Sequence, residues 1–490
     1  MLFEAFKKNR EERADEPAFL IPSGDRYFPI DWKRFTDDIA LVSWIIEKYT
    51  PGSKIALLGE NSYEWMVVHA ATLFTGAVAV PVDPNLNADD IAFRLRKVGA
   101  AVLLHSSLYA EKAHAVAERM PGLATGGFGT RKTDPYLMAA RAAIKFGFHS
   151  IWKRQAVDTE RTSMIVFTSG TTSEPRGVEL SIQCLEAFCD STSRALPLES
   201  GKNSLMLLPL HHIYGISATY YLLVNCVACG VCPDFRRIYD AFERFRVSYA
   251  FLVPALAEIL AGKIALKSKS AEEAFGQSIE WIMTGGAPIS RRAYEKLTGL
   301  GIPVLAIYGL TETCACYSMS KLGDAPHPCS AGRVSMSPDI ETKVSDSGEL
   351  LIRGPNVMKG YYRERGRTAQ AIDAEGWYHT GDVGRIDADG YVWITGRLSR
   401  TIILDSGKKV APEEMEEKIL QLPGIDEVLV SGNVETREII AEVYALVSEE
   451  TVRKLIAELN RTLPVYQRIK TVRTRREPFE RTSSGKIKLG

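Results

Sequence analysis

Residues 163–180, SMIVFTSGTTSEPRGVEL, bring hydroxyl side chains, glycines and one cation together in a single short segment. The apolar residues 164–167 are typical of a buried strand, and this run ends abruptly at a Ser, Thr and Gly sequence. Hydroxyl groups and unhindered backbone N–H groups suit an oxyanion better than a hydrophobic core, and Arg176 adds positive charge. We therefore predict a phosphate-binding loop that contains Thr168, Ser169, Gly170, Thr171, Thr172 and Arg176.

Two other structures compete with a phosphate-binding loop for this segment. Standing alone, the segment also fits an ordinary Ser/Thr/Gly surface turn. A P-loop of the Walker type fits poorly, because six residues separate Gly170 from Gly177 and Arg176 precedes the second glycine. The Walker pattern has about four residues between its glycines and a lysine after the second.

Residues 306–313, AIYGLTET, place three polar groups directly after an apolar run. Tyr308 can stack on a base, Thr311 can donate to a phosphate oxygen, and Glu312 can ligate magnesium through a hard oxygen. A capped helix start is the alternative. In residues 378–382, YHTGD, the carboxylate of Asp382 can accept two hydrogen bonds from a ribose diol.

Three further segments carry groups of the same kinds. Residues 281–288, WIMTGGAP, form an apolar run that stops at two glycines, where a planar ring can lie on bare backbone or where a plain turn begins. His212 in LLPLHHIYG follows another apolar run, and such a histidine is as often a core residue as a ligand. Lys486 lies in the terminal RTSSGKIKLG, where a lysine is usually solvated.

Taken in order along the chain, these segments resemble the motifs of the adenylate-forming superfamily, which includes acyl-CoA synthetases, peptide-synthetase adenylation domains and luciferases. The hinge-like segment GRLSRTIILDSGKKVAPEEME is most similar to fatty acyl-CoA synthetases. Four residues depart from the family pattern: Ser173 and Arg176 in the loop, and Ser399 and Arg400 in the hinge. The resemblance implies catalytic roles for His212, Thr311, Glu312 and Lys486, with Glu312 as magnesium ligand. It implies nucleotide or acyl contacts for Gly285, Gly286, Ala287, Tyr308, Gly309, Asp382 and Arg397, in addition to the phosphate loop.

The resemblance further implies an enzyme that uses ATP, Mg2+ and coenzyme A to convert a carboxylic acid, expected to be a fatty acid, into an acyl-adenylate and then an acyl-CoA. Its products would be acyl-CoA, AMP and pyrophosphate. One alternative is a stand-alone adenylation enzyme that loads an acyl carrier protein. Another is a nucleotide-binding regulatory protein that has lost turnover. The acyl chain, the thiol acceptor and the oligomeric state cannot be read from the sequence.

Short strands that alternate with helices across residues 31–105 and 163–308 indicate an α/β fold with a mainly parallel sheet. Strand-like residues around Asp346-Ser347-Gly348 and Asp389-Gly390 predict hairpins. We therefore expect a large N-terminal domain over residues 1–397, with a β-rich subdomain at about 331–397, and a small mobile α+β domain over 398–490. Residues 121–135, rich in Gly, Thr and charge, are expected to form an exposed connection.

The composition of the chain limits which binding partners and cellular location are expected. Lys plus Arg equals Asp plus Glu at 60 each in 490 residues, so no net charge draws the chain to nucleic acid or to an anionic membrane. Two long apolar stretches are interrupted by polar residues, which favours buried core over a transmembrane segment. Eight scattered cysteines and an N-terminus without a secretory pattern predict a reducing, cytoplasmic location. Cys226, Cys229 and Cys232 have a spacing seen in iron–sulfur proteins, but buried packing is the favoured interpretation.

Overall fold

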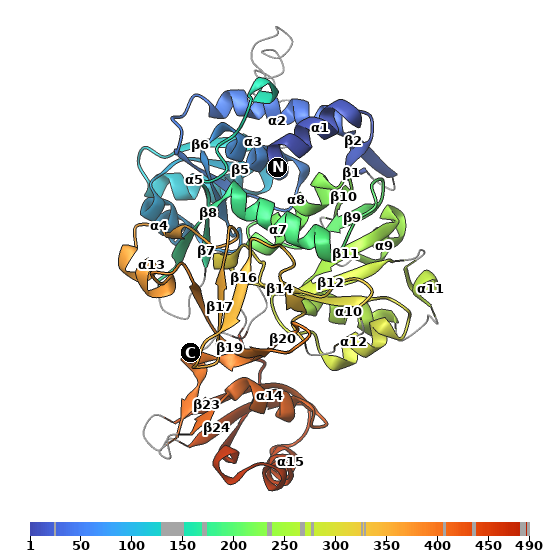
Figure 1. Cartoon of the computed structure of the whole chain (residues 1–490), viewed down its shortest axis with the longest axis vertical. Helices are drawn as coiled ribbons and strands as arrows, with labels where there is room; N and C mark the ends of the chain where they lie inside the picture. The colour runs from blue at the N-terminus through green and yellow to red at the C-terminus, as the bar shows by residue number, and fades with distance from the viewer. Residues whose placement is uncertain are drawn as a thin grey trace. The chain divides into compact units, whose positions relative to one another are not determined.

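The computed structural model describes residues 1–23, 26–128, 151–168, 174–232, 238–264, 270–275, 279–324, 327, 330–404, 408–433, 438–480 and 487. The chain divides into two compact units, which Figure 1 colours by residue number. The first unit contains Met1–Glu341 and Arg353–Tyr378, and the second contains Thr342–Ile352 and His379–Gly490. The expected boundary between residues 397 and 398 stays a prediction.

The first unit holds a seven-stranded sheet with the order β18-β8-β7-β4-β3-β5-β6. Strands β7, β4, β3, β5 and β6 run parallel, whereas β8 and β18 are antiparallel additions at one edge. The strands are β3 (Lys54–Leu58), β4 (Val78–Val82), β5 (Ala100–Ser106), β6 (Ala124–Phe128), β7 (Thr162–Thr168), β8 (Arg176–Ser181) and β18 (Gly360–Tyr361).

A nine-stranded sheet in the same unit has the order β15-β14-β13-β12-β11-β9-β10-β1-β2. Its central strands β13, β12, β11, β9, β10 and β1 are parallel neighbours. The strands are β1 (Pro17–Ser23), β2 (Arg26–Asp31), β9 (Asn203–Met206), β10 (Ala228–Val231), β11 (Val247–Leu252), β12 (Trp281–Gly285), β13 (Val304–Tyr308), β14 (Ser318–Met319) and β15 (Arg333–Val334).

Helices pack against both sheets of the first unit. α3 and α7 contact the seven-stranded sheet and α8 contacts the nine-stranded sheet, while α7 and α8 also contact each other. Helix α3 begins at the N-cap Ser62 and ends at Gly76 in the left-handed conformation, which only glycine adopts readily. The helices of this unit are α1 (Leu2–Glu12), α2 (Trp32–Ile46), α3 (Tyr63–Thr75), α4 (Ala88–Val98), α5 (Ala110–Arg119), α7 (Ile182–Ala195), α8 (Ile213–Val224), α9 (Ile238–Phe245), α10 (Pro254–Ile264), α11 (Ala271–Phe275), α12 (Arg291–Thr298) and α13 (Arg365–Ala371).

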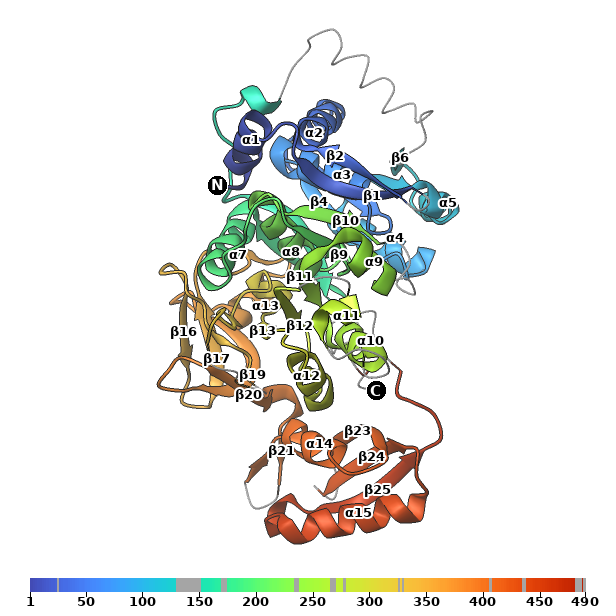
Figure 2. The same ribbon diagram turned by 90° about the vertical axis from the view of Figure 1, so that its right-hand side faces the viewer.

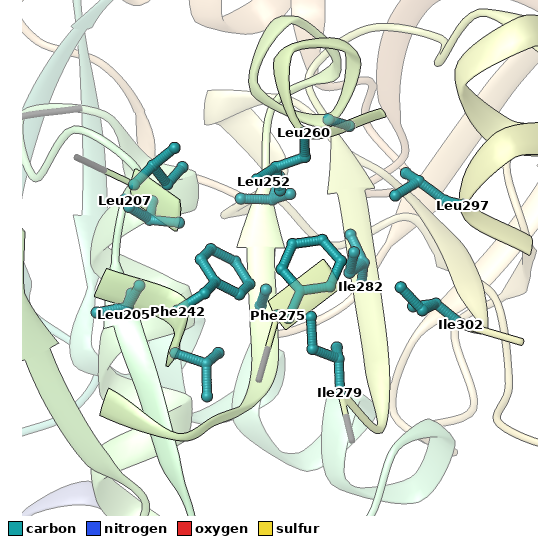
Figure 3. Close-up of a cluster of buried hydrophobic side chains, with 14 of the residues drawn as sticks. Leu205, Leu207, Phe242, Leu252, Leu260, Phe275, Ile279, Ile282, Leu297 and Ile302 are labelled. Carbon is teal, nitrogen blue, oxygen red and sulfur yellow. The ribbon is translucent and has the colours of Figure 1, made fainter. Parts of the chain in front are cut away.

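Apolar side chains from α9 to α12 cover one face of the nine-stranded sheet. Figure 3 shows Phe242 and Phe275 facing each other above the strands, and their ring centroids are 5.3 Å apart. Leu252 and Ile282 rise from β11 and β12 beneath them. This core holds the strands whose carboxyl ends carry several predicted site residues.

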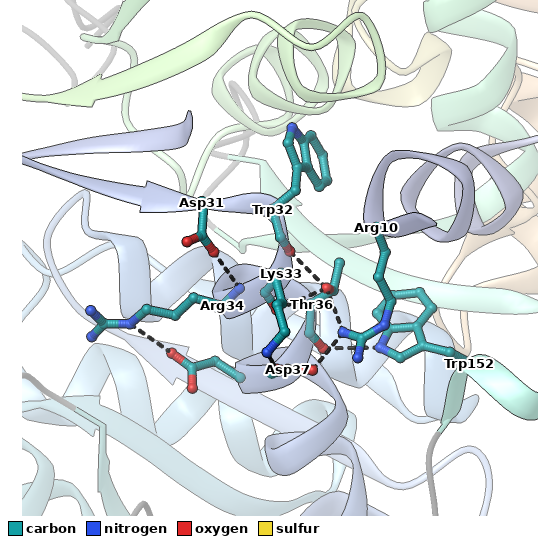
Figure 4. Close-up of polar contacts among 9 residues, drawn as sticks. Arg10, Asp31, Trp32, Lys33, Arg34, Thr36, Asp37 and Trp152 are labelled. Carbon is teal, nitrogen blue, oxygen red and sulfur yellow. Dashed lines mark hydrogen bonds and ion pairs between the residues drawn. The ribbon is translucent and has the colours of Figure 1, made fainter. Parts of the chain in front are cut away.

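Polar contacts fix α1 to α2 at the N-terminal end of the unit. Figure 4 shows the Arg10 guanidinium reaching both the Thr36 hydroxyl, at 2.7 Å, and the Asp37 carboxylate, at 2.5 Å. The indole N–H of Trp152 donates to the Thr36 carbonyl at 2.9 Å. Helix α1 and Trp152 are thereby both anchored to α2.

The second unit contains sheets of four, two and three strands, with orders β16-β17-β19-β20, β21-β22 and β23-β24-β25. In Figure 2, α15 lies along the three-stranded sheet, and it contacts β25. The elements are β16 (Glu341–Val344), β17 (Glu349–Arg353), β19 (Tyr378–Ile386), β20 (Val392–Arg397), β21 (Ile402–Ile403), β22 (Lys409–Val410), α14 (Pro412–Leu420), β23 (Ile425–Gly432), β24 (Ile439–Ala445), α15 (Glu449–Thr462) and β25 (Ile469–Arg475).

The expected α/β fold class is confirmed, and both expected hairpins are present as β16–β17 and β19–β20. One expectation is wrong: part of the segment read as an exposed connection forms β6, parallel to β5. Its two glycines concealed the strand in the sequence, because an edge strand can be held by backbone hydrogen bonds. Gly126 and Phe128 are buried, and the Phe128 ring packs against Gly59. Within the described part of the chain, no helix is long and apolar enough to cross a membrane.

Candidate active site

Three of the predicted segments meet at one edge of the nine-stranded sheet. Strands β9, β11, β12 and β13 are parallel, so the residues that follow them share the edge where open α/β sheets bind ligands. Gly285 pairs with Ile307 across β12 and β13. A Cβ at Gly285 would lie 2.5 Å from the Ile307 side chain and 3.2 Å from the Tyr214 ring, so only glycine fits. The 281–288 turn therefore lies directly beside the segment that follows His212.

Glu312 is held by a strand of the other sheet. It lies on the short helix η4 (Thr311–Thr313) that follows β13. The Tyr361 hydroxyl donates to Glu312 Oε1 at 3.0 Å, and the Met358 N–H donates to the Glu312 carbonyl at 2.8 Å. Tyr361 is on β18, which pairs with β8 through Tyr361 and Val178. These contacts bring the Glu312 carboxylate to the hairpin that carries the predicted phosphate loop.

Arg176 completes this group of charged and polar side chains. It opens β8 opposite Thr168, and its guanidinium carbon lies 5.8 Å from the centroid of the Tyr361 ring. Burial, and then the negative charge of Glu312, raises the pKa of Tyr361, so the phenol stays protonated and donates its hydrogen bond. Tyr378 hydrogen bonds to the Tyr361 hydroxyl in turn. The guanidinium of Arg176, the phenol of Tyr361 and the carboxylate of Glu312 are therefore neighbours in space.

A strained turn positions η4. Cys314 and Ala315 adopt positive φ values of 50° and 60°, which non-glycine residues rarely do. A Cβ at Gly309 would lie 2.2 Å from the Ala315 carbonyl carbon, so this glycine is required by the turn itself. The buried amide of Asn356 donates to the carbonyls of Thr313 and Cys316, at 3.3 and 2.6 Å. Both backbone carbonyls of the turn thereby have a hydrogen-bond donor.

The two histidines lie at the end of the β9 segment. Their ring centroids are 4.4 Å apart, and His211 Nε2 is 3.5 Å from Asp83 Oδ1. Burial, and then the neighbouring His212, lowers the pKa of His211 to about 4, so His211 is neutral at neutral pH. Asn61 fixes the preceding backbone: its amide donates to the carbonyls of Met206 and Leu208 and accepts from the Leu210 N–H, at 3.1, 2.8 and 2.9 Å.

In the second unit, Asp382 and Arg397 form an ion pair. They are opposite each other in the β19–β20 register, with Arg397 Nε 2.7 Å from Asp382 Oδ1. The Asp382 residue is only 3% exposed, whereas the Arg397 side chain is 39% exposed. Nearby, Glu349 accepts from His379 Nδ1 and from the Gly381 N–H, at 2.9 and 2.8 Å. The side chain of Asp382, which is predicted to bind the ribose, is therefore oriented by residues of its own sheet.

Several predicted residues lie outside the described residues. They are Ser169, Gly170, Thr171 and Thr172 of the phosphate loop and the terminal Lys486. Among the described ones, Gly286 and Ala287 are exposed at the turn after β12, and Gly286 has a φ of 85°. Tyr308 lies 5.2 Å from Tyr317 between ring centroids. The roles of all these residues stay predictions.

Glu312 fits a magnesium ion of the kind that phosphate chemistry uses. In the described part of the chain, no group of three His, Cys, Asp or Glu residues could hold a metal. Magnesium is ordinarily bound by one or two carboxylates together with substrate phosphates and water. Glu312 is partly exposed and gives one oxygen to Tyr361, so its other oxygen is the atom that would meet such an ion.

The cysteines with iron–sulfur-like spacing are buried. Cys229 lies within β10, and burial raises the pKa of its thiol. Burial likewise raises the pKa of Cys226. All three side chains are buried in the first unit, as the packing interpretation expects.

Sequence reasoning missed Tyr361, Asn356 and Asn61. Each acts through a partner that is far away in the sequence; Glu312 and Tyr361, for example, are 49 positions apart. The pair Gly360-Tyr361 was the available signal, because a glycine next to an aromatic residue is typical of a close backbone approach.

Comparisons with known proteins show the family and the fold of this chain. The family model described as "AMP-binding enzyme" matches residues 6–362. The long-chain-fatty-acid–CoA ligase FadD13 of Mycobacterium tuberculosis is 27% identical, over 83% of this chain and 81% of its own length. The indoleacetate–CoA ligase of Aromatoleum aromaticum is 27% identical, over 79% of this chain and 76% of its own length. The structure of ATP-bound MatB from Rhodopseudomonas palustris superposes with a TM-score of 0.85 at 22% identity, covering 100% of this chain and 97% of that one.

Proposed function

This chain belongs to the AMP-binding enzyme family, and from that premise we propose that it is an AMP-forming acid–thiol ligase that makes an acyl-CoA. A carboxylate oxygen of the acid attacks the α-phosphorus of ATP, and the bond from that phosphorus to the departing pyrophosphate breaks. The sulfur of coenzyme A then attacks the acyl carbon, AMP leaves, and the thiol proton passes to solvent. The first step is needed because a free carboxylate is a poor electrophile.

The observation that carries this proposal is the contact of Arg176, Tyr361 and Glu312. It joins the predicted phosphate loop, from one sheet, to the loop after β13, from the other. A cation and a carboxylate at that junction suit a nucleotide phosphate with its magnesium ion, whose charge would offset the negative charge at the α-phosphate. Asp382 is proposed to accept from the ribose hydroxyls, and Arg397 to hold that carboxylate in place.

The remaining roles are proposed from the resemblance. Lys486 donates to the carboxylate and the α-phosphate during adenylation, and Thr311 donates to a phosphate oxygen. His212 contacts the acyl group. The 281–288 turn and Tyr308 contact the adenine.

A fatty acid is the proposed substrate, and coenzyme A is the proposed acceptor. FadD13 supports a long-chain fatty acid, while the other relative, with the same identity, is an indoleacetate–CoA ligase. The substrate class is therefore decided by assay. Acid-dependent exchange of labelled pyrophosphate into ATP should be measured with straight-chain acids of increasing length, indoleacetate and benzoate.

We expect pyrophosphate exchange to require an acid, and the fatty acids to be the best substrates. Thioester formation is then measured with coenzyme A and with a pantetheinylated carrier protein in parallel. Transfer to the carrier protein alone would make the chain a carrier-loading enzyme. Binding of ATP without exchange for any acid would favour the regulatory alternative and contradict the proposed ligase.

A further inference from the structure

Lys97 links three segments that are distant in the sequence. It lies in the last turn of α4, and its Nζ is 2.7 Å from Glu364 Oε1 and 3.1 Å from the carbonyl oxygen of Pro175. Pro175 immediately precedes Arg176, at the end of the predicted phosphate loop. The side chains of Lys97 and Glu364 are only 22% and 17% exposed, so solvent screens their contact less than it screens a surface pair.

Glu364 is itself firmly held. It is the N-cap residue of α13, which lies next to α4 in Figure 1. Its N–H donates to the Tyr361 carbonyl at 2.9 Å, and Arg367 Nε is 3.1 Å from Glu364 Oε2. The carboxylate therefore presents a fixed acceptor to Lys97, three residues from the tyrosine that holds Glu312.

A second attachment runs beside the first. The Tyr362 N–H donates to the Gly177 carbonyl at 2.8 Å, and its hydroxyl donates to the Val98 carbonyl at 3.2 Å. Gly177 has no space for a side chain, since a Cβ would lie 2.8 Å from the Ile165 side chain. The backbone on both sides of Arg176 is thus tied to the end of α4, by Lys97 before it and by Tyr362 after it.

We propose that Lys97 is a positioning residue for ATP binding, which fixes the end of the phosphate loop through the Pro175 carbonyl while Glu364 fixes Lys97. This inference rests on the proposed binding of ATP at the loop. Proline has no N–H and a nearly fixed φ, so its carbonyl is the group by which the rest of the protein can orient the chain at that point. Lys97 supplies a charged donor to that carbonyl.

The test is the affinity for ATP with magnesium, measured by calorimetry on the full chain without any acid. Lys97→Met removes the donor and should raise the Kd about tenfold, as expected for the loss of one charge-assisted hydrogen bond. Lys97→Arg keeps a charged donor and should recover most of that loss. Glu364→Gln leaves Lys97 free to contact the Pro175 carbonyl and should have an intermediate effect.

The matched control is Lys33→Met, which removes a similar but exposed lysine–carboxylate pair with Asp37 and should leave the Kd unchanged. Thermal unfolding is followed for every variant. An unchanged Kd in Lys97→Met, with or without a lower melting temperature, would overturn the inference and leave only a structural ion pair. Failure of acid-dependent pyrophosphate exchange in the unmodified chain would contradict the ligase proposal instead, and the ratio of Kd values would still decide the role of Lys97.

Discussion

Removal of the Tyr361 hydroxyl tests whether this residue orients Glu312 for the metal-bound phosphates. In Tyr361→Phe the ring stays beside Arg176, while the 3.0 Å hydrogen bond to Glu312 Oε1 and the hydrogen bond from Tyr378 are lost. A hydrogen bond to a charged group contributes roughly 1.5–3 kcal/mol. Glu312 is partly exposed, so we take the lower end, about 1.5 kcal/mol, which corresponds to about a tenfold change.

The assay is pyrophosphate exchange with the best acid, titrated with magnesium. We expect Tyr361→Phe to lower kcat/KM for ATP about tenfold and to raise the magnesium concentration at half-maximal rate. Glu312→Gln, in which a neutral amide replaces the ligand, should lower activity further. Because the tyrosine acts through the carboxylate, the double variant should be no worse than Glu312→Gln alone.

Tyr63→Phe is the matched control. It removes a phenol–carboxylate bond of the same kind, 2.8 Å long, to Asp38. It should lower stability and leave the magnesium titration unchanged. If the losses of Tyr361→Phe and Glu312→Gln multiplied in the double variant, or if Tyr361→Phe behaved as the unmodified enzyme, the orienting role would be refuted.

Three further predictions concern stability, ribose binding and the terminal lysine. Burial lowers the pKa of His69 to about 3, against about 6.5 when unfolded, so its contribution to stability is complete above 6.5 and is lost as the pH falls toward 3; near pH 4.5 roughly 3 kcal/mol should be lost. Urea unfolding at neutral and acidic pH should show this loss in the unmodified chain and in the exposed-histidine control His114→Gln. The loss should be smaller by roughly 3 kcal/mol in His69→Phe, in which the buried His211 still titrates. Asp382→Ala should weaken ATP binding by roughly 1.5–3 kcal/mol in calorimetry, and equal affinities would remove Asp382 from the nucleotide. Lys486→Ala should abolish pyrophosphate exchange but spare thioester formation from a supplied acyl-adenylate, and wild-type exchange would contradict its role.

The order of the chemical motifs and the alternation of strands and helices were readable from the sequence. Each of these features is local: a run of apolar residues, a cap such as Ser62, or a glycine such as Gly76 determines its element within a few residues. The alternation expected across residues 31–105 is present as α2, β3, α3, β4, α4 and β5. Family membership follows from the same local signals, because they recur in a fixed order along the chain.

Tertiary structure alone decided which groups act together. The contact of Tyr361 with Glu312 and that of Lys97 with Glu364 join residues 49 and 267 positions apart. The sequences around these residues do not reveal the contacts. A side chain that reaches a carboxylate on another element does not change the hydrophobic periodicity of its own element. The edge strand β6 was missed for a related reason, because backbone bonds to β5 stabilise it and its own side chains contribute little. Local propensity determines an element, but only the packing of both sheets determines which polar atoms come within hydrogen-bond distance.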